Sequence, residues 1–303
     1  MIPFVRQMRF DYGRAEQVSP LIRRVIARNP GPFTYTGTGV HIVGHGTVAV
    51  IDPGPDIQSH LDAILAATAG EQISHIFVTH SHLDHSPLAR PLAAITGATI
   101  YAGGAPARPS GGDDRLEAGD DLGFSPDVAL MDGARFFGPG WTIKAMATPG
   151  HTANHFAYAL AEENALFPGD CVMGWSTSVV SPPDGDMAEY MASLEKVRRR
   201  RFTTLWPAHG PPIREVDAFL DAYLAHRHAR ERQVLEALES LGPATIRRLV
   251  PILYADVDRR LHPAAAHSTL AHLIKLVREG RVTCSGLPTF GAVFRPGRLR
   301  DAA

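Results

Sequence analysis

The chain has 303 residues, of which 45% are hydrophobic and 20% charged, with a formal net charge of −1 at pH 7. These proportions are typical of one large globular domain, or of a large and a small one, and exclude a fibrous or disordered chain. No N-terminal run resembles a signal peptide and no later run approaches a membrane span, so we expect a cytoplasmic protein without membrane contact. Cys171 and Cys284 form no metal-binding or disulfide spacing, and we expect both to be reduced.

Charge is distributed unevenly along the chain. Residues 226–303 contain 13 Lys and Arg against 7 Asp and Glu, whereas residues 1–225 contain 17 against 24, giving net charges of +6 and −7. This asymmetry predicts two domains, 1–225 and 226–303, with different partners. A solvated helix face would produce the same excess of positive charge, so the asymmetry alone does not identify a nucleic-acid partner.

Strands and helices alternate in the first domain. The apolar pattern and the turn residues predict the following elements in chain order: two strands over 38–54 with a turn at Gly44–Gly46, a helix over 56–68, a strand over 73–80, a helix over 86–96, a strand over 98–103, a long loop over 102–120, strands over 134–137, 141–151, 156–162 and 165–170, a helix over 186–201, a strand over 203–210 and a long helix over 215–238. This order predicts strands in inner layers and helices outside.

The tail reads as a small separate module. Two further helices are expected over 241–254 and 262–280, the first with Thr245 near its N-cap, and a β-hairpin is expected from 281–286 and 291–296. Helices followed by a hairpin are the order of elements in a winged helix.

Several potential metal ligands occur at the ends of predicted strands. The stretch HSHLDH at 80–85 crowds three histidines and an aspartate into one turn, and three later strands each break at a proline-containing turn before His151, Asp170 and His209. Neutral imidazoles and carboxylates are the ligands of divalent transition metals, and zinc is the default for a histidine-rich set. Each of these residues alone could equally be a polar loop residue, but the recurrence favours a metal site.

We expect the other histidines to bind no metal. Four of them are predicted on strand or helix surfaces and five on helix faces or at caps: His41, His45, His60 and His75, and His226, His228, His262, His267 and His272.

The stretch HSHLDH resembles the HxHxDH signature of the metallo-β-lactamase-fold hydrolases, and the later ligands follow in that family's order over roughly residues 33–225. The resemblance implies an α/β fold, a four-layer αβ/βα sandwich, with two metal ions per chain. It places His80, His82 and His151 on one zinc, Asp84, His85 and His209 on the second, and Asp170 between them. Iron and manganese also occur in this family.

Segments along most of the chain are similar to the branch of this family represented by β-lactamase-like protein 2, including PGHTANHFAYALAEENALFPGDCVMG, PAHGPPI and HSTLAHLIKLVREGRV. That branch joins the lactamase fold to a C-terminal winged helix, and its best-known member is implicated in cleaving single-stranded RNA. Pro87 departs from the branch, where Gly-Gly often follows the serine. The stretch 175–186 is longer and more apolar than expected, which predicts a reshaped cleft.

The resemblance implies a zinc-dependent hydrolase that uses a metal-bridged hydroxide on an ester, thioester or phosphodiester. Asp84 would be both ligand and proton carrier. His155 would either contact substrate or support the ligands through a hydrogen bond. The expected partner is a small acyl compound or single-stranded RNA, and the apolar loop 172–183 suggests a lid or a homodimer contact. An endoribonuclease is the main alternative, and a β-lactamase or a DNA-binding regulator is less favoured.

Overall fold

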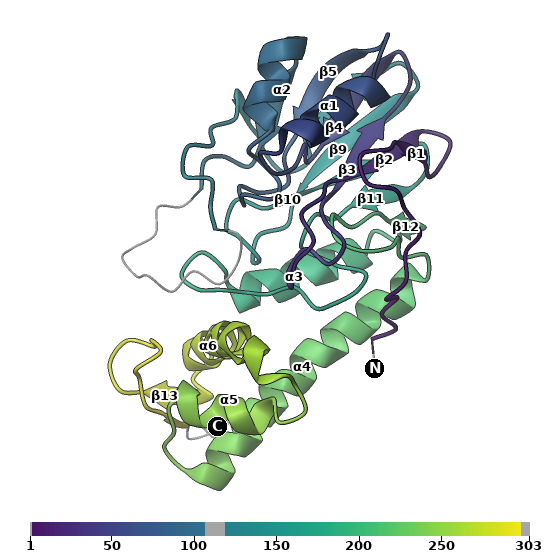
Figure 1. The fold of residues 1–303 in the computed structure, drawn as a ribbon. Coiled ribbons are helices and arrows are strands. Elements are labelled where there is room, and N and C mark those ends of the chain that lie inside the picture. Colours follow the sequence, from purple (N-terminus) through teal and green to yellow (C-terminus); the bar gives the residue numbers. More distant parts are fainter. Residues whose placement is uncertain (1, 107–118, 298–303) are drawn as a thin grey trace.

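Two stacked β-sheets with helices on their outer faces form the larger part of the molecule (Figure 1). The computed structural model describes residues 2–106 and 119–297. The first sheet has the order β1-β2-β3-β4-β5-β6-β7, antiparallel up to β4 and parallel from there on. Its strands are β1 (Glu16–Gln17), β2 (Ile22–Ile26), β3 (Gly39–Val43), β4 (Thr47–Ile51), β5 (Gln72–Phe77), β6 (Thr99–Ala102) and β7 (Val128–Ala129).

The second sheet has the order β12-β11-β10-β9-β8, and only its β11–β12 pair is parallel. Its strands are β8 (Arg135–Gly138), β9 (Trp141–Ala147), β10 (Phe156–Leu160), β11 (Ala165–Phe167) and β12 (Thr204–Leu205). Large side chains from both sheets, such as Phe77, Trp141 and Phe167, fill the space between them. Burial of these aromatic side chains from water is a main source of stability for the sandwich.

Two pairs of helices complete the four layers. Val40 and Ile42 of β3 pack under α1 (Gln58–Ala67) and α2 (Ala89–Thr96) on the first sheet. On the second sheet, α3 (Met187–Arg198) and the first half of α4 (Val216–Leu241) bury Tyr190 and Tyr223. Side chains alternate between the two faces of each strand, so each sheet packs against helices on one face and against the other sheet on the opposite face. The predicted four-layer αβ/βα sandwich is confirmed.

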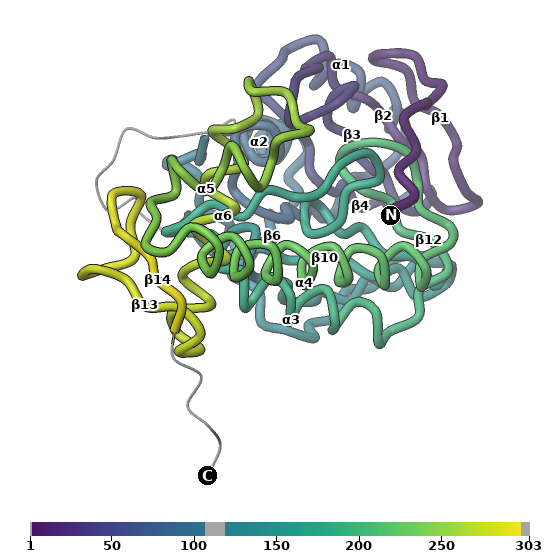
Figure 2. The backbone as a smooth tube through the Cα atoms, turned by 90° about the horizontal axis from the view of Figure 1, so that it is seen from below, coloured from purple at the N-terminus to yellow at the C-terminus, as the bar shows by residue number. Residues whose placement is uncertain are grey.

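The C-terminal module is built around the second half of α4. It contains α5 (Ile246–Leu253), the 3₁₀ turn η1 (Arg259–Leu261), α6 (His262–Arg278) and the hairpin of β13 (Val282–Cys284) and β14 (Phe294–Pro296). Apolar side chains such as Val234, Leu273 and Phe294 form its own core. The winged helix is therefore confirmed. The predicted boundary at 225/226 falls inside α4, which crosses from one part to the other as one helix (Figure 2).

Several sequence expectations differ from the structure. Strands β1 and β2 were not predicted, because Arg23 and Arg24 interrupt the apolar pattern of β2. His41 and His60 are buried rather than on strand or helix surfaces, and His267 and His272 lie on buried faces of a helix. The long loop predicted over 102–120 includes residues 107–118, which lie outside the described residues. In the loop 172–183, Val172 and Val180 are buried in the core below the second sheet, whereas Trp175 and Val179 are partly exposed.

No helix within 2–106 and 119–297 combines the length and the apolarity that crossing a bilayer requires.

Candidate metal centre

The turn after β5 is held by a buried carboxylate from the neighbouring strand. Strands β4 and β5 are parallel, so their carboxyl ends lie together, and Asp52 follows β4 directly. Its two oxygens accept hydrogen bonds from the backbone N–H and the hydroxyl of Thr79, at 2.7 and 2.8 Å. His85 Nδ1 lies 3.0 Å from Asp52 Oδ2, so Nδ1–H donates and Nε2 faces the opposite way. Asp52 was missed from the sequence; its only signal is its place at the end of a strand adjacent to β5.

The same carboxylate orients His80 through the hydroxyl of Thr79. Since that hydroxyl donates its proton to Asp52, its oxygen accepts from His80 Nδ1–H at 3.0 Å. His80 Nε2 then has a lone pair directed toward His82 Nδ1, 2.9 Å away. A lone pair on a buried ring nitrogen is what coordination to a metal requires.

Loops of the second sheet deliver the later ligands. His151 follows β9, Asp170 follows β11 and His209 follows β12. The Nδ1–H of His151 donates to the carbonyl oxygen of Val179 at 2.7 Å, which leaves Nε2 on the inner side of the loop. Gly150 precedes it with φ of 126°, and a Cβ there would lie 2.2 Å from the backbone nitrogen of Tyr190. Only glycine lets this loop pass so close to α3.

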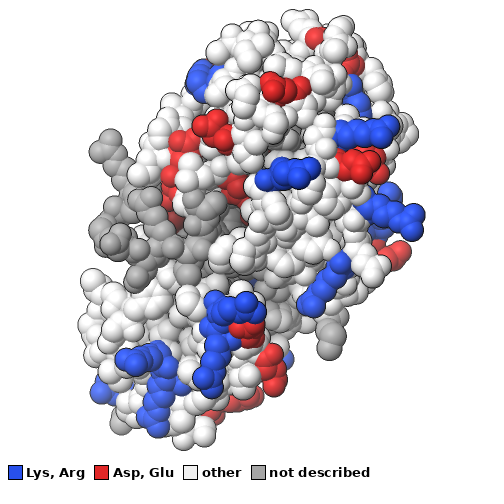
Figure 3. Space-filling model, in the orientation of Figure 1, with Lys and Arg blue, Asp and Glu red and all other residues white. Residues whose placement is uncertain are grey.

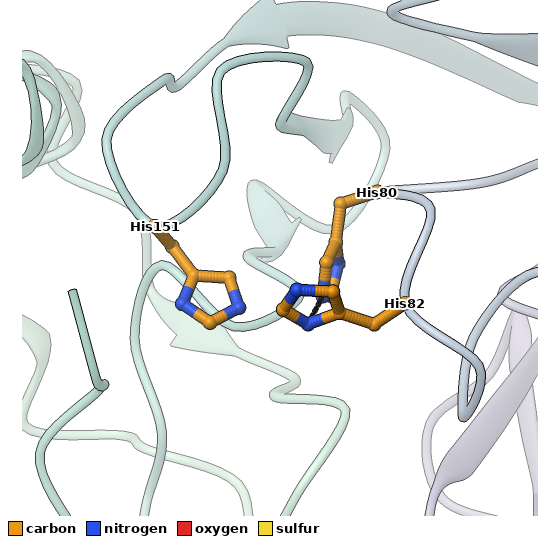
Figure 4. A group of neighbouring side chains, drawn as sticks. All are labelled: His80, His82 and His151. Atoms are coloured by element: carbon orange, nitrogen blue, oxygen red, sulfur yellow. Dashed lines mark hydrogen bonds between the residues drawn. The ribbon is translucent and has the colours of Figure 1, made fainter. Parts of the chain in front are cut away.

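The predicted ligands converge into three overlapping groups. In each group the potential ligand atoms lie within 4.8 Å of one another: His80, His82 and His151; His80, His85 and Asp170; and Asp84, His85 and His209. In Figure 4, His80 and His82 extend from one loop and His151 faces them from another. All seven residues predicted as ligands are thus brought together, and none lies apart from the cluster.

Asp170 faces both ends of the cluster. Its Oδ1 lies 3.4 Å from His209 Nε2 and 3.6 Å from His85 Nε2, and its Oδ2 lies 3.9 Å from His151 Nε2. Asp84 Oδ2 lies 3.1 Å from His209 Nε2. One carboxylate therefore faces the two outer groups, which is the placement expected of a ligand shared between two ions.

The protonation states of the cluster suit cation binding. Burial, with the neighbouring histidines, holds the pKa of His80 well below its usual value and lowers that of His82 to about 3. For Asp84 and Asp170, burial alone would raise the pKa, but the adjacent imidazoles lower it well below the usual range. Burial likewise opposes protonation of His209, yet Asp170 and Asp84 raise its pKa to about 10. The cluster therefore holds ionised carboxylates, neutral imidazoles at His80 and His82, and a protonated imidazole at His209, whose proton occupies the place of a cation.

Three inward atoms provide a direct test of whether a metal fits. His85 Nε2, Asp170 Oδ1 and His209 Nε2 are buried and form no hydrogen bond of acceptable geometry with the described residues. Leaving buried polar atoms without partners is costly unless another group satisfies them. A divalent cation coordinated by these nitrogen and oxygen atoms would do so, and the donor set fits a transition metal.

His155 lies beneath the ligands rather than among them. It is fully buried, and its Nε2 accepts the backbone N–H of Asp170 at 3.3 Å, so its Nδ1–H donates to the hydroxyl of Thr148 at 2.8 Å. Burial, with the charge of His151, holds its pKa well below the usual value. These contacts favour the supporting role over direct contact with substrate.

A cleft of about 300 Å³ leads from the cluster to the C-terminal module. His82, Asp84 and Asp170 line one end, and the loop 175–179 lines a side. The wall beyond comes from α4, from Tyr254 and Val257, and from Leu261 to Ser268 at the start of α6. Both parts of the chain therefore shape the space in front of the cluster.

The metallo-beta-lactamase superfamily model matches residues 38–209, which contain every residue of the cluster. The chain belongs to this superfamily. The beta-lactamase-associated winged helix domain matches residues 245–287 of this superfamily member. The chain is also 32% identical to a beta-lactamase-like protein 2 homolog of Caenorhabditis elegans, with 91% of this chain and 90% of that protein covered.

Two further comparisons place this superfamily member among its relatives. It is 31% identical to an atrochrysone carboxyl ACP thioesterase of a Cryptosporiopsis species, over 88% of this chain and 83% of that protein. A beta-lactamase domain protein from Burkholderia ambifaria shares the fold, with a TM-score of 0.78 at 19% identity, over 98% of this chain and 97% of the other. The superfamily and the names of these relatives identify the chain as a hydrolase.

Proposed function

We propose that this protein is a hydrolase of thioester-type acyl compounds that depends on two divalent transition-metal ions, with zinc as the default. The observation that carries the proposal is the convergence of seven imidazoles and carboxylates, six of them buried and His82 partly buried, among them Asp170 with its oxygens turned toward two groups. Relatives that are named as thioesterases and align over most of the chain support the substrate class. Localisation in the cytoplasm stays a prediction, as does a homodimer.

In this proposal the chain's residues have distinct roles. His80, His82 and His151 would hold one ion, Asp84, His85 and His209 the other, and Asp170 both. When bound, the ions would lower the pKa of a coordinated water and polarise the carbonyl under attack. Asp84 lines the cleft, so its carboxylate is placed to accept a proton from the attacking water and return it to the leaving thiolate. Asp52 and His155 would act as positioning residues, because they orient His85, His80 and the Asp170 backbone.

The lining of the cleft favours a small acyl compound over a polymer. Apolar groups of Met173, Val179, Val257 and Leu261 form much of the wall, and the volume of about 300 Å³ is at the lower end for small-molecule sites. An acyl chain would bury its carbons against these side chains.

An endoribonuclease acting on single-stranded RNA is the second candidate, because basic side chains gather over the C-terminal part of one face. Figure 3 shows Lys and Arg concentrated there, where Figure 1 places α5, α6 and β13. Phosphate contacts would use such a surface. Few aromatic side chains lie between these basic residues in sequence, which disfavours stacking of unpaired bases.

The test combines metal analysis with turnover on the same sample. The panel contains an acyl thioester, a lactone, a phosphodiester reporter and a single-stranded RNA. We expect about two metal ions per chain, hydrolysis of the thioester, and a loss of kcat of roughly 10³-fold in Asp84→Asn. Asp62→Asn, on the exposed side of α1, serves as control. Cleavage of RNA alone would replace the thioesterase proposal with the nuclease, and less than one ion per chain without turnover would refute both.

A further inference from the structure

Two arginines of α4 face the cleft without a carboxylate partner. Arg227 and Arg230 both line the cleft that Asp84 and Asp170 also line. No Asp or Glu of the described residues lies within 4 Å of either guanidinium, and the nearby Glu231 pairs instead with Lys275 at 2.7 Å. Arg227 is only 3% exposed. A positive charge withdrawn from water without a counter-ion is costly, so its presence beside a cleft indicates a negatively charged ligand.

Both guanidinium groups are held in place yet retain unused donors. Arg227 Nη2 donates to the carbonyl oxygen of Ser178 at 2.5 Å, and the group lies over the ring of Tyr190 at 4.9 Å. Arg230 Nη1 donates to the carbonyl oxygen of Leu253 at 2.6 Å and stacks over Tyr254 at 4.0 Å. The Nε–H groups of both are buried and form no hydrogen bond with the described residues. Arginine presents five N–H donors in a planar fork suited to carboxylate and phosphate oxygens.

The rest of this wall adds polar groups to an otherwise apolar surface. His226 Nδ1, one residue before Arg227, is also buried without a hydrogen-bond partner among the described residues, and so is Trp175 Nε1 across the cleft. Trp175 is stacked on Tyr35 with ring centroids 5.0 Å apart, which gives that side a rigid aromatic face. The cleft therefore joins a cation-binding end, apolar sides and a cationic wall. A ligand complementary to it has a hydrolysable bond, an apolar stretch and an anionic group.

We propose that Arg230, together with Arg227, binds an anionic group of the substrate, a carboxylate or a phosphate, so that α4 selects negatively charged thioesters. The thioester in this statement rests on the function proposed above, whereas the anion site rests on the arginines themselves. The winged helix module would then contribute a specificity wall of the cleft, and Arg230 would be a specificity-determining residue.

The experiment measures binding rather than turnover, so that it stands apart from the test of catalysis. Three thioethers that cannot be hydrolysed share one butyl-pantetheine frame: one neutral, one with a 4′-phosphate and one with a carboxylate at the end of the acyl chain. Isothermal titration with the full metal-loaded chain gives their dissociation constants. We expect an anionic thioether to bind roughly tenfold or more tightly than the neutral one. The anion that gains affinity, phosphate or carboxylate, identifies the source of the charge.

The variants separate recognition of charge from support of the fold. Arg230→Gln should remove the preference for the anionic thioether and leave the affinity for the neutral one unchanged, and Arg230→Lys should restore part of the preference. Arg232→Gln, an exposed arginine of the same helix, should behave as the unaltered protein. Equal weakening of both thioethers in Arg230→Gln, or no preference for an anion in the unaltered protein, would overturn the proposal. So would a dependence on Arg230 seen only with a single-stranded RNA oligomer.

Discussion

The two walls of the cleft place their polar groups in opposite ways. On the wall formed by the strand ends, imidazoles and carboxylates from four loops surround one another, so Asp84 and Asp170 each have imidazole nitrogens within 4 Å. On the α4 wall, Arg227 and Arg230 come from one turn of one helix, and no carboxylate of the described residues lies within 4 Å of either guanidinium. The difference indicates that a metal site needs ligands from several segments of the chain, whereas selectivity for a charged substrate needs only side chains on one face of a helix.

The largest expected effect tests whether the wall formed by the strand ends holds two metal ions. We expect His151→Ala and His209→Ala each to lower bound metal to about one ion per chain and kcat by roughly 10³-fold, because the two residues belong to different groups. Metal analysis of the dialysed protein and turnover of a thioester are the measurements. His45→Ala, at an exposed turn, is the control. Complete loss of metal from either variant would indicate a single site.

A substitution in the loop before His151 tests how tightly this loop packs against α3 behind the wall formed by the strand ends. Gly150→Ala combines a positive φ with a Cβ 2.2 Å from a backbone nitrogen, so we expect a loss of about 3 kcal/mol in the free energy of unfolding. Gly280→Ala, after α6, shares a positive φ of 71° but meets open space, so it should cost only about 1 kcal/mol. Urea denaturation of both proteins measures the difference. Equal losses would mean that the loop can shift away from α3.

Asp52 lies beneath the metal cluster and orients two of its histidines, so we expect its substitution to have a smaller effect, on metal affinity. Asp52→Asn keeps the shape of the side chain but weakens its hydrogen bonds with Thr79 and His85. We expect metal affinity to fall about 10- to 100-fold, as for other residues that orient metal-binding histidines. Competition with a chelator measures the affinity, and the exposed Asp56→Asn is the control. Unchanged affinity would show that the backbone alone orients the histidines.

The smallest expected effect concerns the stability of the C-terminal module, which lies behind the α4 wall of the cleft. Burial would raise the pKa of Glu231, but His272 Nδ1 and the Lys275 ammonium, 3.7 and 2.7 Å from its Oε1, lower it to about 2 from 4.5. A carboxyl with a depressed pKa stabilises the folded state above about pH 4.5 and loses that contribution as the pH falls toward 2. Glu231→Gln should therefore cost on the order of 2 kcal/mol at pH 7, with the difference shrinking below pH 4.5.

Thermal unfolding between pH 2 and pH 7 measures this dependence. Glu236→Gln, an exposed glutamate of the same helix, should show no such trend. A constant difference between Glu231→Gln and the unaltered protein down to pH 2 would contradict it.

Much of the fold was accessible from local patterns. The hairpin of β3 and β4, the parallel strands β5 and β6, and α3 all appear as clear apolar periods with turn residues between them. Strand β2 could not be predicted, because Arg23 and Arg24 look solvent-exposed in the sequence. In the tertiary structure they pair with Glu71 and Glu16. The burial of His41 and His60 is likewise invisible in sequence, since the partners that cover these rings come from other segments.

The sequence by itself determined which residues could be ligands, because each stands at the break of an apolar strand and four share a single turn. Only the tertiary structure decided that His151, Asp170 and His209 meet that turn, because two sheets must stack before their strand ends converge. It alone also revealed Asp52 below the cluster and the two arginines of α4 in the cleft. A lone carboxylate or guanidinium takes its role from what surrounds it, and no local pattern records those surroundings.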